Sequence, residues 1–100
     1  MLFFVISTPR RSRATTKLIE ARLAFRKWLK SLGKRVVCFY PREDRGSVVV
    51  FNVGSRRELH IILRDWRTFV HARLDVHPLQ DPVQANKHLS MQLHQLKRKE

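Results

Sequence analysis

Cysteine, glycine and acidic residues are scarce in this sequence, which has 1 Cys, 3 Gly and 8 Asp and Glu among its 100 residues. The single Cys38 excludes a disulfide within the chain and a metal site built from several thiolates. Uninterrupted apolar runs such as residues 1–6 and 48–51 are far shorter than the roughly 20 residues that span a bilayer. We therefore expect one soluble, cytoplasmic domain with a single modest core and no membrane partner.

Positive charge is what the sequence has in excess. The 21 Lys and Arg against 8 Asp and Glu give a formal net charge of +13. A field of this size attracts phosphates, acidic ligands or anionic surfaces, and it does not specify a fold.

Hydrophobic patterning predicts four strands and three helices. The alternation of residues 70–77 and the β-branched runs predict strands near 2–8, 35–40, 47–53 and 70–77. An apolar stripe that ends at Gly33 predicts a helix near 15–32, and a capping box from Ser55 to Glu58 opens a second near 55–66. Asp81 followed by Pro82 begins a third, near 82–96, whose last residues should fray.

The order of these elements predicts a ferredoxin-like α+β domain over residues 1–80, with a helical tail over 81–100. Its β-α-β-β-α-β arrangement makes an antiparallel sheet with the first and third strands at the centre. Both helices pack on one face of the sheet, because each has only one apolar stripe. We expect the other face to expose part of Phe3, Val5, Val49 and Phe51 and to be covered by a second copy. The expected assembly is a homodimer, a dimeric α/β barrel, with the tail helix packed across the partner.

The segment 48–60 (VVVFNVGSRRELH) resembles the strand–turn–helix signature of muconolactone isomerase-like proteins, and residues 1–5 (MLFFV) and 72–79 (ARLDVHPL) are also similar. The likeness covers roughly residues 1–80. It implies the dimeric α+β barrel and, for true isomerases, a small lactone bound in the cleft between sheet and helices. In this chain Asn52 stands where the family usually has Asp, and the first helix is nearly all basic beyond Glu20.

The polar face of the last predicted strand is the main candidate site. Arg73 and Asp75 are candidate ligand-binding residues together with Asn52, and Arg73 would hold a small anionic ligand. His71 or His77 would act as the base of a proton transfer, and Tyr40 would supply a hydroxyl donor. The alternative is a solvated edge strand, or His and Arg side chains that pair across the dimer, with Tyr40 an ordinary strand-end aromatic. We predict no metal site and no cofactor, since no His or carboxylate cluster has ligand spacing.

Nucleic acid is the alternative partner. The same element order serves RNA-recognition domains, and residues 45–51 (RGSVVVF) faintly resemble their central-strand motif. Ser47 and Val49 stand where two stacking rings belong in that motif, so the base-stacking platform is missing. A mode that follows the phosphate backbone would use basic side chains of the first loop and helix: Arg10, Arg11, Arg13, Arg26, Lys27, Lys30 and Lys34.

Overall fold

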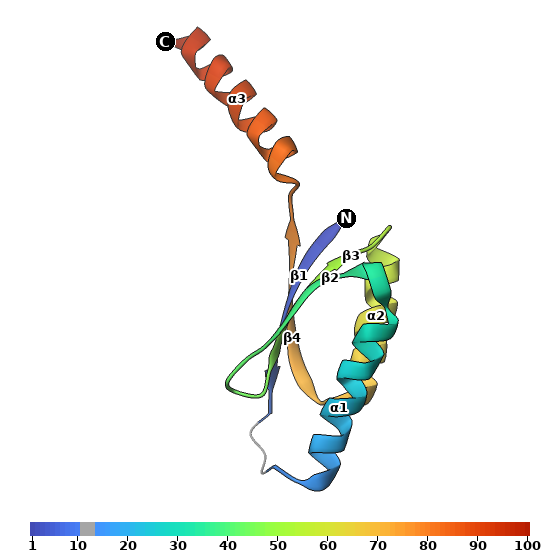
Figure 1. Cartoon of the computed structure of the whole chain (residues 1–100). Helices are drawn as coiled ribbons and strands as arrows, with labels where there is room; N and C mark the ends of the chain where they lie inside the picture. The colour runs from blue at the N-terminus through green and yellow to red at the C-terminus, as the bar shows by residue number, and fades with distance from the viewer. Residues whose placement is uncertain (11–13) are drawn as a thin grey trace.

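The computed structural model describes residues 1–10 and 14–100 and contains a four-stranded antiparallel sheet, two helices against one face of it and a third helix beyond it (Figure 1). The elements in chain order are β1 (Leu2–Pro9), α1 (Thr16–Ser31), a 3-10 turn η1 (Gly33–Arg35), β2 (Val36–Pro41), β3 (Ser47–Asn52), α2 (Arg56–Phe69), β4 (Ala72–Leu79) and α3 (Pro82–Lys99). The predicted fold class, a ferredoxin-like α+β domain with a C-terminal helix, is confirmed.

The strand order is β2-β3-β1-β4, so the first and third strands are central as predicted. Both strands meet their neighbours in antiparallel register, with Val5 opposite Val49 on one side and opposite Val76 on the other. The residues of these strands that face the helices are apolar, and the intervening residues on the other face of the sheet are apolar as well, so the two runs hardly alternate in sequence.

The core lies between the sheet and the two helices. Trp66 of α2 is fully buried, with its ring centroid 4.8 Å from that of Phe25 of α1 and 6.1 Å from that of Phe51 of β3. A second aromatic contact, 5.4 Å between the ring centroids of Trp28 and Phe69, joins α1 to the end of α2. The aromatic side chains of both helices therefore form one layer above the central strands.

One prediction about this sheet is wrong. Phe3, Val5, Val49 and Phe51 do not lie on the open face: each is 1% exposed or less and packs beneath the helices. Because side chains alternate along a strand, the open face carries the intervening residues instead, which are Phe4, Ile6, Val48 and Val50, all partly exposed. An apolar sheet face is thus left uncovered, as predicted, but the other set of alternate residues forms it.

Several element ends differ from their predicted positions for local reasons. α2 continues to Phe69 because that side chain packs on Trp28. β4 continues through Pro78, which a strand tolerates at the edge of a sheet, where the missing N–H faces no neighbour. α3 continues to Lys99 rather than fraying after residue 96. Gly33 has the predicted left-handed conformation, with φ of 60°.

Candidate functional site

The residues of the predicted site that lie within strands, which are all of them except His71, belong to the open face of the sheet. The register of β1 with β4 puts His77 opposite Phe4 and Asp75 opposite Ile6, and Phe4 and Ile6 are open-face residues. The rings of His77 and Phe4 lie 6.2 Å apart, centroid to centroid. Arg73 is two residues before Asp75 on the same face, and the exposed His71 immediately precedes β4.

A single chain does not bring these residues into one cluster. Tyr40 belongs to β2, whereas His77 lies within β4 and His71 just before it, so the full width of the sheet, about 14 Å for three strand spacings, separates Tyr40 from the histidines. His71 and His77 are themselves about 20 Å apart along the strand at 3.3 Å per residue. Asn52 lies at the end of β3, and its Oδ1 accepts a hydrogen bond of 3.4 Å from the Met1 amine.

The predicted anion ligand Arg73 is paired within its own strand. Its Nε donates to Oδ1 of Asp75 at 3.2 Å, and the two side chains are 78% and 37% exposed. A ligand carboxylate at Arg73 would have to compete with this neighbouring carboxylate. The ion pair therefore makes Arg73 a poorer site for a small anion than the sequence alone indicated.

A groove of about 610 Å³ between α1 and β2, which we call the α1–β2 groove, offers a different anion site. Its lining residues are Arg26, Lys27, Leu29, Lys30, Gly33, Val36 and Phe39. Leu29 is buried, and Val36 and Phe39 are partly buried against the core, so the floor of the groove is apolar. Three of the other lining residues are basic, and none is acidic.

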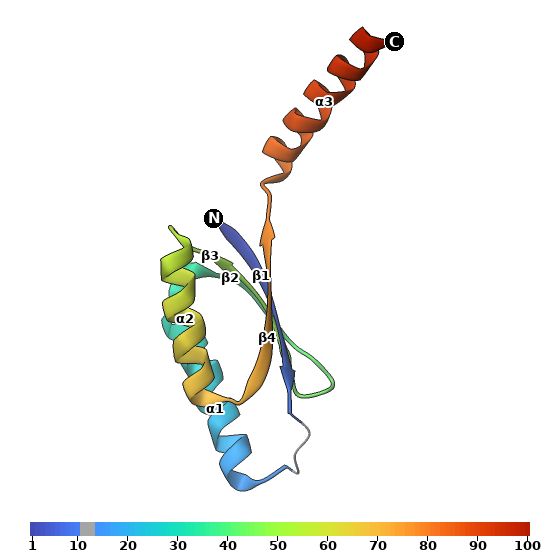
Figure 2. The same cartoon turned by 180° about the vertical axis from the view of Figure 1, so that it is seen from behind.

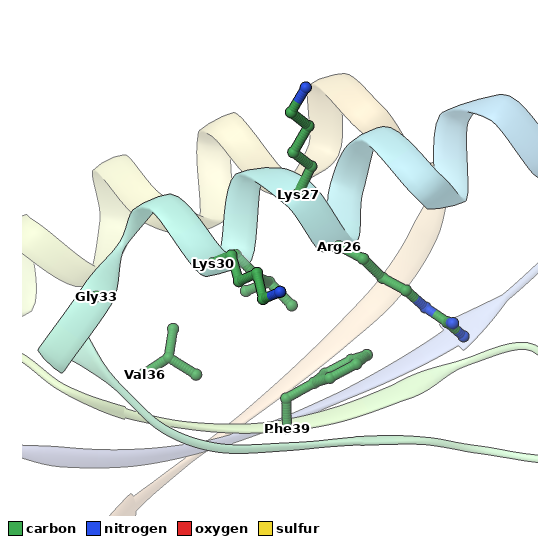
Figure 3. Close-up of a pocket in the computed structure, with 7 residues that line it drawn as sticks. Arg26, Lys27, Lys30, Gly33, Val36 and Phe39 are labelled. Atoms are coloured by element: carbon green, nitrogen blue, oxygen red, sulfur yellow. The ribbon is translucent and has the colours of Figure 1, made fainter.

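The basic side chains of the groove differ in direction (Figure 3). Arg26 and Lys30 reach from α1 toward the space beside the Phe39 ring, whereas Lys27 points away from the sheet. The Arg26 guanidinium carbon is 5.9 Å from the centroid of the Phe39 ring, within the range of a cation–π contact. Arg26 and Lys30 are four residues apart, so the helix places both on one face. The groove can thus hold a negative group and an apolar ring side by side.

Sequence reasoning missed this groove, although it singled out the residues. Arg26, Lys27 and Lys30 were predicted to form a solvated or phosphate-binding face of the first helix. The signal that could have found the groove is Gly33, because the left-handed turn there brings Val36 and Phe39 back under α1. Arg11 and Arg13 of the predicted phosphate-binding set lie outside the described residues.

The segment 48–60, which carries the family resemblance, contains the N-terminus of α2. Ser55 Oγ accepts a hydrogen bond of 3.2 Å from the Glu58 N–H, and Glu58 Oε2 accepts one of 2.8 Å from the Gly54 N–H. Ser55 and Glu58 thus cap the helix as predicted, except that Glu58 accepts from the residue before the N-cap instead of from the N-cap itself. These residues are therefore explained by local structure and do not by themselves indicate an active site.

Three other features bear on ligand class. Ser47 and Val49 are 8% and 0% exposed and face the helices, so these positions offer no surface for stacking bases. Across residues 1–10 and 14–100, no three His, Cys, Asp or Glu side chains are grouped so that they could hold a metal ion. In the same part of the chain no helix has the length and apolar character that crossing a membrane requires.

Comparison with known proteins shows the fold. No protein-family model matches the sequence, and a search of the curated proteins found no match. A solved structure that resembles this one is 5-chloro-2-hydroxyhydroquinone dehydrochlorinase (TftG) from Burkholderia phenoliruptrix AC1100 in complex with 2,5-dihydroxybenzoquinone. The TM-score is 0.64 at 19% identity, and the match covers 84% of this chain and 98% of the other. The likeness shows a shared fold, a small α+β domain with a four-stranded antiparallel sheet, and the other protein has the dimeric α+β barrel form of it.

Proposed function

We propose that this protein binds a small anionic molecule with an apolar ring, such as an aromatic carboxylate, in the α1–β2 groove. The observation that carries the proposal is the placement of Arg26 and Lys30 beside an apolar floor that ends at Phe39. The ring would lie on Phe39 and Val36, while the carboxylate accepts charge-assisted hydrogen bonds from the two basic groups. A fold shared with an enzyme solved with a small hydroxylated quinone supports a small ligand.

We also propose that the protein is a homodimer held by its open sheet faces. Phe4, Ile6, Val48 and Val50 form a continuous apolar area across the two central strands, in register as Phe4–Val50 and Ile6–Val48 pairs. Soluble monomers rarely expose such an area, and a second copy related by a two-fold axis covers it with the same residues.

An isomerase acting on a small anionic lactone is the finer form of this proposal. That reaction moves a proton next to a carbonyl and needs a base within hydrogen-bond reach. The lining of the α1–β2 groove offers only Lys and Arg as titratable groups, so it fits binding better than proton transfer. The proposed bases His71 and His77, and the proposed hydroxyl donor Tyr40, would act only where a dimer brings the open faces together.

Calorimetric titration with benzoate, and with the neutral isostere benzamide, tests the groove. We expect benzoate alone to bind, with Arg26→Gln and Lys30→Gln each weakening it by roughly tenfold or more, because a charge-assisted hydrogen bond is lost. Lys27→Gln is the matched control: it removes the same charge from the same helix, but its side chain points away from the sheet. Equal losses in all three variants would mean that net charge alone attracts the anion.

The nucleic-acid alternative has its own readout. Binding of a generic oligonucleotide that falls steeply between about 50 and 200 mM salt would indicate phosphate contacts through counterion release. Such binding, together with no response to benzoate or to a carboxylated lactone, would replace the small-ligand proposal.

A further inference from the structure

α3 is a helix with no buried surface. None of its residues is buried, and the leucines at 89, 93 and 96 are 63%, 56% and 59% exposed. Both views show it leaving the end of β4 and extending away from the rest of the molecule (Figures 1 and 2). The whole chain, α3 included, is 64 Å long against 26 and 19 Å across. An 18-residue helix extends about 27 Å at 1.5 Å per residue, so its apolar stripe points beyond the body of its own chain.

The stripe of α3 has the spacing of a short coiled coil. Asn86, Leu89, Leu93 and Leu96 follow one another at intervals of three, four and three residues, which puts Leu89 and Leu96 at d positions and Asn86 and Leu93 at a positions. An Asn at one a position is the residue that fixes register and two-stranded pairing in parallel coiled coils. Two heptads are too few to pair alone, so such a helix needs its partner held nearby.

The direction of α3 bears on how two copies meet. Figures 1 and 2 show α1 and α2 on one side of the sheet and α3 leaning toward the other, the open side, where the proposed dimer partner lies. If the two-fold axis ran across the strands, the two α3 helices would project from opposite ends of the dimer and stay exposed. If it runs along the strands, both helices leave the same end and lean toward each other.

We propose that the dimer's two-fold axis runs along the strands and that α3 pairs in parallel with α3 of a second copy. This inference rests on the proposed dimer and specifies its geometry.

The same axis joins the two halves of the candidate site. It lays the β2 edge of one copy over the β4 edge of the other. Tyr40 pairs with Val48, Val48 with Ile6 and Ile6 with Asp75, so Tyr40 and Asp75 lie at one level along the strands. Tyr40 of one copy therefore faces the Arg73–Asp75 pair of the second copy, across packed sheets about 10 Å apart. The site residues that one chain holds on opposite edges come together at the interface.

Disulfide crosslinking of the full chain tests the pairing. In a Cys38→Ser background, Asn86→Cys puts one thiol at an a position, where parallel partners are close enough to bond. Gln95→Cys is the matched control: it is also polar and exposed, and nine residues further along the helix it lies on the opposite side. We expect Asn86→Cys to become mainly a covalent dimer on mild oxidation while Gln95→Cys stays mainly uncrosslinked.

A second pair of variants tests the stripe without cysteine chemistry. Leu93→Ser should weaken the dimer by about tenfold or more, because two symmetric leucines lose their buried contact. Met91→Ser should leave it unchanged, since Met91 is as exposed as Leu93, at 61%, but lies on the other side of the helix.

The outcomes separate this inference from the dimer on which it rests. Crosslinking that is absent or equal in both cysteine variants, with a dimeric mass by light scattering, would overturn the α3 pairing and leave the sheet-face dimer in place. A monomeric mass would overturn both. A third outcome is that the protein cosediments with anionic lipid vesicles, that Leu93→Ser abolishes this cosedimentation, and that Asn86→Cys does not crosslink. That outcome would make α3 a membrane-surface helix and would also overturn the pairing.

Discussion

The two faces of the sheet are made by the same four strands but differ in what they present. Beneath the helices lie Phe3, Phe51 and Val49, all essentially without exposed surface. The opposite face has partly exposed apolar side chains, among them Phe4 and Val48, between Tyr40 at one edge and the charged row of β4 at the other. The covered face thus provides the stability of the chain, while the open face holds the residues predicted for proton transfer and the surface that we propose for a second copy.

A matched pair of phenylalanines measures this difference most directly. Phe51→Ala should reduce the free energy of unfolding by about 3–5 kcal/mol, because a fully buried ring leaves a cavity beside Trp66. Phe4→Ala, on the open face, should cost only about 1 kcal/mol at concentrations at which the protein is monomeric. Urea titration of both variants gives the comparison, and equal losses would contradict the division between the faces.

Val48→Glu breaks the open face without touching the core. A carboxylate in the centre of a sheet-to-sheet interface costs several kcal/mol when it is buried unpaired. Light scattering should therefore report 11.9 kDa rather than twice that mass, with the circular dichroism of the fold unchanged. Ile61→Glu, an equivalent change at a residue of α2 that is 44% exposed, should leave the dimer intact.

The smallest expected effect concerns the helix start that carries the family resemblance. Ser55→Ala removes the acceptor of the Glu58 N–H and should cost about 1 kcal/mol of stability, measured by thermal unfolding. If the segment is structural, as its hydrogen bonds indicate, benzoate affinity should stay the same. A large loss of ligand binding at unchanged stability would instead make Ser55 part of a binding site.

Sequence patterns predicted most of the fold because local signals and topology agree. The buried runs of β1 and β3, the Gly33 stop and the Ser55 capping box each specify a local structure, and right-handed connections then fix the strand order. The sequence did not say which alternate residues the helices cover, because Phe3 and Phe4 are both apolar and either could face the core. Which of the two is buried depends on how the helices dock.

The candidate site was less predictable for the same reason. The alternation of β4 correctly grouped His77, Asp75 and Arg73 on one face. It could not show that Tyr40 lies across the full width of the sheet or that Arg73 pairs with Asp75. The α1–β2 groove depends on how close a helix and a strand come, and the spacing of residues within either element does not report that distance.

The position of the two tryptophans decides which changes intrinsic fluorescence can detect. Trp66 is fully buried and Trp28 packs on Phe69, so both indoles belong to the layer between helices and sheet. Their emission should follow the unfolding of the core closely. Association through the open face or α3 leaves both environments unchanged, so assembly of this protein would not change the tryptophan emission and must be followed by mass.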